Sequence, residues 1–134
     1  MIHHGLHSIG EVAALIAAGK TLLLAGDEAL LTQLPPGRWI GGTIANFMCD
    51  AGGVENRTAI FVTDISDCVA DARITTYDEK TIPQISADYA ANGFTLLILP
   101  YLSAIHMTYA KDVMRYDGVF NAPLVGWVSG VAVS

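Results

Sequence analysis

The apolar residues of this chain lie in short runs that polar residues, glycines and prolines interrupt at regular intervals. Hydrophobic residues make up 52% of the 134 residues and charged residues only 15%, with a mean hydropathy of +0.44. Runs such as Leu96–Leu99 are far shorter than the roughly 20 residues that a membrane-spanning helix needs. The pattern therefore predicts buried strands and helices with an apolar subunit or domain interface, and no membrane segment.

Four helices are predicted from their start signals. Ser8 and Glu11 have the spacing of a capping box, and Asp27 is placed to cap a second helix. A third helix begins near Ile82 with a proline in its first turn, and Ser103 caps the fourth. The expected helices cover residues 8–19, 27–34, 82–92 and 103–115.

Strands are predicted where short apolar runs are bounded by turn residues. Phe94–Leu99 is the most apolar of them and is expected at the centre of the sheet, whereas Asp50–Asn56 is expected to form a polar loop. The expected strands cover residues 21–25, 39–47, 58–63, 69–77, 94–99 and 119–133. This order predicts an α/β (α+β) fold in a single domain, residues 1–134, with one mixed β-sheet and about four helices packed on it.

Charge and cysteine usage narrow the classes of partner and compartment. The net charge of −6, with lysines and arginines scattered singly, argues against nucleic-acid binding, which needs a basic stripe. No basic segment followed by an apolar core and a cleavage site is visible near the start, so no secretory signal is predicted. Cys49 and Cys68 lack a CxxC pattern and are expected to be reduced, small buried side chains in a cytoplasmic protein.

Each of the two tryptophans lies in a glycine-rich stretch with strand character, residues 38–44 and 124–131. Glycine inside a strand marks a bulge, or a close approach by a ligand or another backbone. Tryptophan adds a flat apolar wall with one N–H donor. The two stretches predict a ligand cleft, although a tight contact between subunits fits them as well. The expected ligand-binding residues are Trp39, Gly41, Gly42, Thr43, Tyr101, Ser103, Gly126 and Trp127.

His106 is the candidate catalytic residue. It lies one turn into the helix that follows the most apolar strand, and ligands of α/β sheets collect beyond the ends of such strands. An imidazole there suits a general acid or base, with Tyr101 or Ser103 assisting, or an axial ligand of haem. The alternative is a structural ring, hydrogen-bonded to a backbone carbonyl or to the Ser103 hydroxyl.

Two further clusters could hold a metal ion but have simpler interpretations. His3, His4 and His7 have spacings at which imidazoles can converge, yet they lie in an N-terminal tail without a carboxylate or thiolate partner. Asp64, Asp67 and Asp71 form an acidic cluster that is more typical of a hairpin turn. We therefore predict no metal site. The chain also lacks the GxGxxG and GxxxxGK[ST] motifs of nucleotide-binding proteins.

The glycine-rich stretches also carry a family resemblance. The segment 121–130, with Pro123-Leu124-Val125-Gly126, resembles the Pro-hydrophobic-hydrophobic-Gly-Gly strand of FIST-type sensory domains, although Trp127 replaces the second glycine. The segment Ile40–Thr43 resembles the family's glycine-rich strand. The resemblance implies a small-molecule-binding sensory module, with haem as a possible cofactor, in a shortened or partial domain. It places Gly41, Gly42, Thr43, Gly126 and Trp127 on the ligand wall and transfers no catalytic residue.

These observations leave three functional hypotheses. The first is a small-molecule-binding domain of sensory type, which is not an enzyme. The second is a small enzyme that uses His106 as general acid or base, with the Gly41 and Gly42 amides holding an oxyanion. The third is a structural subunit whose apolar surface forms a homo-oligomer.

Overall fold

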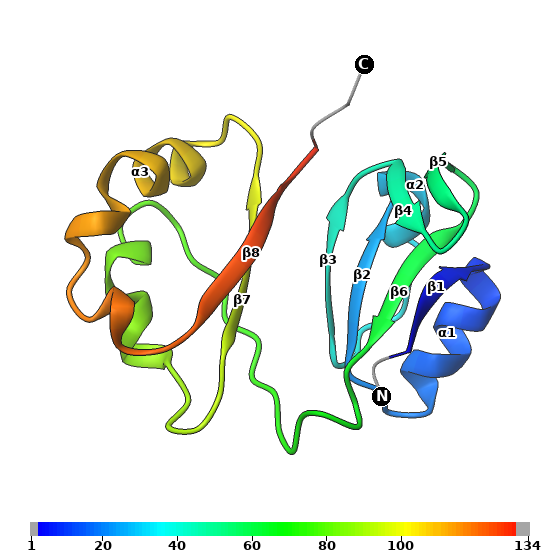
Figure 1. The fold of residues 1–134 in the computed structure, drawn as a ribbon, viewed down its shortest axis with the longest axis horizontal. Coiled ribbons are helices and arrows are strands. Elements are labelled where there is room, and N and C mark those ends of the chain that lie inside the picture. The colour runs from blue at the N-terminus through cyan, green and yellow to red at the C-terminus, as the bar shows by residue number, and fades with distance from the viewer. Residues whose placement is uncertain (1–2, 131–134) are drawn as a thin grey trace. The chain divides into compact units, whose positions relative to one another are not determined.

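A computed structural model describes residues 3–130 of the chain (Figure 1). The α+β class predicted from the sequence is confirmed. Instead of forming around one sheet, the chain divides into two compact units, and its described residues form three sheets. The described part of the first unit comprises residues 3–74 and Gly130, and the second unit comprises Thr75–Ser129. Within the described residues, no helix is long and apolar enough to cross a membrane.

The first unit contains a mixed four-stranded sheet. In spatial order its strands are β1 (His3–His7), β6 (Ile60–Asp64), β2 (Leu22–Gly26) and β3 (Trp39–Thr43). Strands β2 and β3 are parallel, whereas β6 runs antiparallel to both β1 and β2. A separate antiparallel hairpin consists of β4 (Asn46–Cys49) and β5 (Gly52–Glu55).

Two capped helices cover one face of this sheet. The Ser8 hydroxyl accepts a hydrogen bond from the Glu11 N–H (3.3 Å) at the start of α1 (Ile9–Ala17). The Asp27 carboxylate accepts one from the Ala29 N–H (3.0 Å) at the start of α2 (Glu28–Leu31). Both predicted N-caps are therefore confirmed. The helices and strands enclose the first core, formed by Val12, Ile16, Leu22, Leu24, Leu31, Ile60 and Val62.

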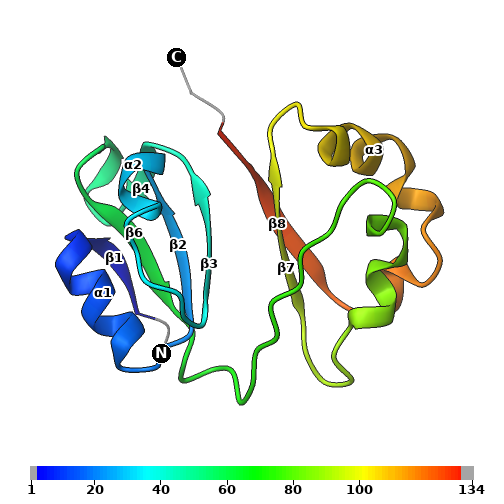
Figure 2. The ribbon, with the colours of Figure 1, turned by 180° about the vertical axis from the view of Figure 1, so that it is seen from behind.

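The second unit is a parallel strand pair with helical segments on one side, as Figures 1 and 2 both show. Its strands are β7 (Thr95–Pro100) and β8 (Leu124–Ser129), and α3 (Ala104–Asp112) begins the connection between them. The second core is built from Ile82, Ile85, Tyr116 and Val119. The remaining segments are the 3₁₀ helices η1 (Ile82–Asp88), η2 (Val113–Arg115) and η3 (Val119–Asn121).

Several predicted elements were wrong. Residues 69–77 form no strand: they are irregular and almost wholly exposed, since no neighbouring strand pairs with them. Strand β7 is not central, because its sheet contains only β7 and β8. The third predicted helix is a short 3₁₀ helix, and residues 119–121 are helical rather than extended. Residues 131–133 of the last predicted strand lie outside the described residues.

Other corrections concern segments that the sequence predicted to be irregular or buried. The N-terminal histidines belong to strand β1, which pairs with β6, and the predicted polar loop contains strand β5. Both cysteines are free, as expected, but Cys49 is only half-buried and Cys68 is exposed. A strand needs a partner more than it needs apolar residues, and polar segments that find one can therefore be extended.

Gly126 lies on β8 opposite Leu97 of β7, where the two backbones of the second unit come close together. A Cβ atom built on Gly126 would lie 1.8 Å from the carbonyl oxygen of Leu97 on β7. No side chain fits at that distance, so any larger residue must push the two backbones apart. The sequence predicted that this glycine marks a bulge, or a close approach by a ligand or another backbone. The structure confirms the close approach of another backbone.

Asp64 supports the turn that leaves β6. Its carboxylate accepts hydrogen bonds from the N–H and the hydroxyl of Ser66, and Lys20 Nζ lies 3.9 Å from it. Burial alone would raise the pKa of this carboxyl, but the Ser66 hydrogen bonds and the Lys20 charge outweigh it. The pKa of Asp64 is therefore lowered from its ordinary value of 3.8. Asp64 thus has the predicted turn role, although no hairpin forms.

We expect Gly126→Ala to destabilise the second unit by at least about 2 kcal/mol, because the methyl group overlaps the Leu97 carbonyl. Urea unfolding followed by Trp127 fluorescence in a Trp39→Phe background measures this. Val125→Ala, at an exposed position in the same strand, is the matched control and should cost less than about 1 kcal/mol. Equal losses in the two variants would show that the close approach is not a constraint.

Asp64→Asn should lower the free energy of unfolding at pH 7 by about 1 kcal/mol, because a neutral acceptor replaces a charged one. A carboxyl with a lowered pKa stabilises the fold above pH 3.8, and this contribution disappears as pH falls through the folded-state pKa. In urea titrations, the difference from wild type should therefore shrink below pH 3.8 and close as the pH falls through the folded-state pKa. A gap that persists at low pH would contradict this, and Asp67→Asn, exposed in the same turn, is the control.

Candidate functional site

A groove with a volume of about 300 Å³ lies within the second unit. One wall comes from α3, through His106, Tyr109 and Ala110. The other comes from Leu97 and Leu99 of β7 and from residues 124–128 of β8. The groove is therefore lined mainly by aliphatic and aromatic side chains, and it contains no Lys, Arg, Asp or Glu.

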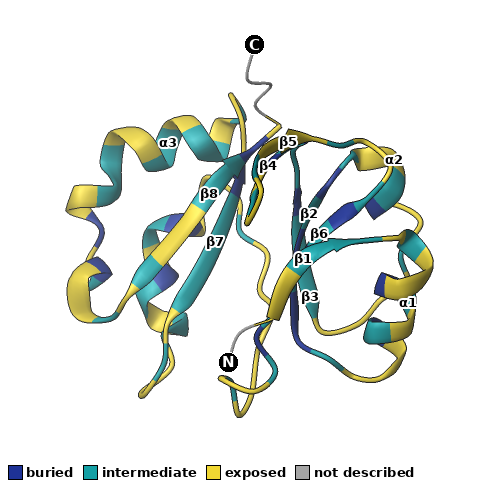
Figure 3. Cartoon of the chain, turned by 45° about the vertical axis from the view of Figure 1, so that its right-hand side comes forward, coloured by how far each residue is buried: buried dark blue, intermediate teal, exposed yellow. Residues whose placement is uncertain are grey.

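Helix and strand periodicity explain these walls. His106, Tyr109 and Ala110 stand at positions i, i+3 and i+4 of α3, which share one helix face. Leu97 and Leu99 alternate along β7 and so point to one side of the strand pair. Figure 3 shows that α3 has exposed and intermediate positions but no buried residue. The helix thus leaves room between itself and the strands.

His106 is held in place by the turn that precedes α3. The Leu102 N–H donates a hydrogen bond to His106 Nδ1 (3.0 Å), and the Ser103 hydroxyl accepts one from the His106 N–H (3.2 Å) as the N-cap of α3. The Tyr101 ring lies 5.9 Å from the imidazole, centroid to centroid. The structural role expected for His106 is therefore present, but through a backbone amide instead of a carbonyl.

This contact determines which ring nitrogen of His106 can carry a proton. Because Nδ1 accepts the Leu102 N–H, it has no hydrogen of its own, and the neutral ring carries its hydrogen on Nε2. Nε2 is then the nitrogen that is left for an occupant of the groove. In this tautomer it is a hydrogen-bond donor and not an acceptor.

Leu102 adopts an unusual backbone conformation to make this bond. Its φ is 54°, in the left-handed region that a leucine rarely occupies, and its side chain is 65% exposed. Such a conformation costs about 1–2 kcal/mol in an L-residue. The turn between β7 and α3 therefore stores backbone strain next to the groove. Strained backbone of this kind clusters at functional sites in proteins.

Tyr109 is the other polar group in the groove. Burial raises the pKa of its hydroxyl, which therefore stays protonated at neutral pH. Its ring makes an edge contact with Tyr116, at a centroid distance of 6.1 Å. The Tyr116 hydroxyl is buried without a hydrogen-bond partner, and burial together with Asp112 and Tyr109 raises its pKa.

The predicted ligand-binding residues fall in both units. Gly126, Trp127 and His106 line the groove, and Tyr101 and Ser103 lie in the turn that positions His106. The other predicted residues, Trp39, Gly41, Gly42 and Thr43, belong to β3 of the first unit.

The first tryptophan-glycine stretch has a local structural explanation. The indole N–H of Trp39 donates to the Pro35 carbonyl (2.9 Å), and the ring packs against the first core. A Cβ on Gly41 would lie 3.2 Å from the Trp39 ring and 3.3 Å from the Leu24 carbonyl oxygen. Glycine therefore leaves space for the Trp39 ring and the neighbouring strand β2. The role of β3 in ligand binding stays a prediction.

The groove does not fit a haem ligated by His106. A histidine that binds iron through one ring nitrogen usually donates a hydrogen bond from the other. Here Nδ1 accepts a hydrogen bond, so ligation through Nε2 would require an imidazolate or the loss of the Leu102 contact. The second coordination shell that a haem ligand needs is therefore missing.

The candidate metal clusters are dispersed by the fold. His4 stacks on Phe61 (6.0 Å between centroids), whereas His7 pairs with Glu11 (2.8 Å). Neighbouring residues of a strand point to opposite faces, so the His4 side chain leaves the face of His3. Across residues 3–130, no three His, Cys, Asp or Glu side chains come together as metal ligands.

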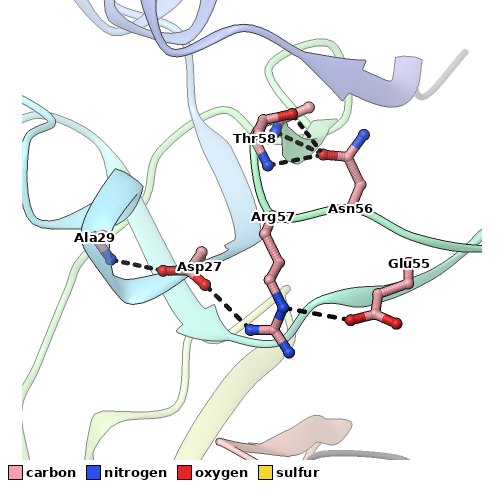
Figure 4. A network of polar contacts seen from close by, with 7 residues as sticks. Asp27, Ala29, Glu55, Asn56, Arg57 and Thr58 are labelled. Atoms are coloured by element: carbon pink, nitrogen blue, oxygen red, sulfur yellow. Dashed lines mark hydrogen bonds and ion pairs between the residues drawn. The ribbon is translucent and has the colours of Figure 1, made fainter.

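A second polar cluster lies in the first unit (Figure 4). Arg57 contacts Asp27 through Nη1 and Glu55 through Nε, both at 3.3 Å. Asp27 also caps α2, so Arg57 ties the segment after β5 to that helix. Because both acidic partners occupy Arg57, which is largely exposed, we interpret the cluster as a structural support of small energetic value.

The sequence prediction missed the apolar part of the groove. Tyr109 and Ala110 could have been found, because they lie on the His106 face of the predicted helix. Leu97 and Leu99 could not, since a strand pair with an open side has the same sequence pattern as a buried central strand. The two cases differ only in how β7 is paired, and in the described structure β7 pairs with β8 alone.

Leu102→Gly should stabilise the second unit by about 1 kcal/mol, because glycine adopts positive φ without strain. Met107→Gly, at an exposed position inside α3, should have the opposite sign and cost about 1 kcal/mol. Urea unfolding of both variants in the Trp39→Phe background measures the two changes. If Leu102→Gly destabilises like Met107→Gly, the strain at Leu102 is not present in solution.

Comparisons with known proteins give a family but no function. No curated protein and no solved structure matches the chain. Residues 7–134 match the family described as "Family of unknown function (DUF6976)". The match covers nearly the whole sequence, and the chain therefore belongs to DUF6976, a family of unknown function.

Proposed function

We propose that this protein binds a small organic molecule in the groove of its second unit. The observation that carries the proposal is the composition of the groove, in which apolar walls from β7, β8 and α3 surround one oriented polar group, His106. Binding sites for small molecules combine largely apolar linings with a few polar groups that set orientation. The volume of about 300 Å³ fits a compact ligand.

The tautomer of His106 favours binding over acid–base catalysis. A general base must present an unprotonated nitrogen to its substrate, but the neutral ring carries its proton on Nε2. A neutral imidazole is also a very weak acid. A bound ligand is therefore better supported than a substrate.

A sensory role, as the FIST-type resemblance implies, is part of this proposal. The turn at Leu102 connects the groove to strained backbone, so a ligand that contacts His106 can alter the turn. The proposal retains Gly126 and Trp127 from the ligand wall that the resemblance implied, and it does not include haem.

Filling the groove should abolish binding. Ala110 lines the groove and is exposed, so Ala110→Phe places a ring inside it; Ala104→Phe adds the same ring at an exposed α3 position outside the groove. We expect uncharged aromatic fragments to shift the backbone N–H signals of residues 124–128, which line the groove, in ¹H–¹⁵N spectra of wild type and Ala104→Phe. Binding to Ala110→Phe should be at least about tenfold weaker, because the added ring competes with the fragment.

Two outcomes would contradict the proposal. The first is equal binding by Ala110→Phe and Ala104→Phe, which would place the fragments elsewhere. The second is the absence of binding to wild type together with a self-association that Ala110→Phe alone abolishes in sedimentation experiments. The groove would then be a contact between copies of the chain, as the structural-subunit hypothesis expects.

A further inference from the structure

The donor character of His106 restricts the class of ligand that the groove can hold. This step rests on the proposed function and adds the chemistry of the occupant. The Leu102 N–H lies 3.0 Å from Nδ1, so that nitrogen is occupied from the protein side. The remaining ring nitrogen, Nε2, then carries a hydrogen and needs an acceptor.

The backbone fixes this arrangement more firmly than a side-chain contact would. The Leu102 N–H can only donate, and its position is set by the turn between Pro100, where β7 ends, and Ser103, where α3 is capped. A proton on Nδ1 would face this N–H, donor against donor. Exchange to the other tautomer therefore requires the contact to break.

The other groups of the groove exclude charged ligands. Among the described residues, no lysine or arginine lines it, and the Leu102 N–H already occupies His106 Nδ1, so a carboxylate or phosphate would be buried without a permanent counter-charge. The net charge of −6 further disfavours anions. An ammonium group would meet the Nε2–H and find no carboxylate in the lining.

We infer that the ligand is an uncharged, largely apolar molecule with one carbonyl-type oxygen that accepts a hydrogen bond from His106 Nε2. The hydrocarbon part lies against the leucines of β7 and the residues of β8. The Tyr109 hydroxyl, which can both donate and accept, is the second group available to a polar substituent.

Three probes of one shape test the ligand class: indane, 1-indanone and indane-1-carboxylate. We expect 1-indanone to bind wild type roughly fivefold more tightly than indane, because one net hydrogen bond is gained. The carboxylate should bind more weakly than either. Dissociation constants come from titrations of the backbone N–H signals of residues 124–128, and ¹⁵N shifts of the His106 ring report the tautomer directly.

Two variants distinguish the hydrogen-bonding roles of the two ring nitrogens of His106. In His106→Asn, the amide oxygen can take the place of Nδ1 and keep the Leu102 contact, while the Nε2 donor is lost. In His106→Gln, the longer side chain can place an N–H near the former Nε2. The ketone preference, taken as the ratio of the 1-indanone and indane affinities within each variant, should vanish in His106→Asn and return at least in part in His106→Gln.

Each result bears on a different statement. If no probe binds wild type, the proposed function and the ligand class are both wrong. If indane and 1-indanone bind equally, or His106→Asn keeps the ketone preference, the groove binds ligands but His106 is not the donor. Preferred binding of the carboxylate would overturn the uncharged class, and ring shifts with the hydrogen on Nδ1 would overturn the tautomer.

Discussion

The candidate site depends on the parallel pairing of β7 and β8 at Gly126. The two strands lie far apart in the sequence, and α3 begins the connection between them. Glycine allows the β8 backbone to meet the Leu97 carbonyl, at a place where any side chain would collide with it. This pairing brings Trp127 and the leucines of β7 to one groove, with His106 on the opposite wall. Without this strand pair, the α3 wall of the groove would have no opposite wall.

The two tryptophan-glycine stretches look alike in the sequence but differ physically. In the first unit, Gly41 leaves space for the ring of Trp39 two residues away, and the indole N–H is used by the Pro35 carbonyl. In the second unit, Gly126 leaves space for a neighbouring backbone, and Trp127 lines the groove. A glycine beside an aromatic residue thus predicts a close approach, but the sequence does not reveal what approaches.

Local signals explain what could be predicted from the sequence. Ser8, Asp27 and Ser103 each bond an amide two or three residues ahead, so their N-caps do not depend on the rest of the fold. Strands need partners that are distant in the sequence. Residues 69–77 have strand-forming side chains, but no strand within residues 3–130 pairs with them, whereas the N-terminal histidines form a strand because β6 pairs with them. The position of His106 was predictable for the same reason as its helix, whereas the part of the opposite wall that Leu97 and Leu99 form was not.

The chemistry of the site is determined by a backbone amide rather than by another side chain. A histidine in an apolar groove can act as a base, a metal ligand or a donor, and its sequence context does not distinguish these roles. The Leu102 N–H distinguishes these roles, because it occupies Nδ1 and leaves the hydrogen on Nε2. That tautomer disfavours a base and an iron ligand at Nε2 for the same reason: both need the lone pair that the hydrogen covers. Strain in the Leu102 backbone is the cost of holding the donor in place, and it is consistent with a site organised for recognition.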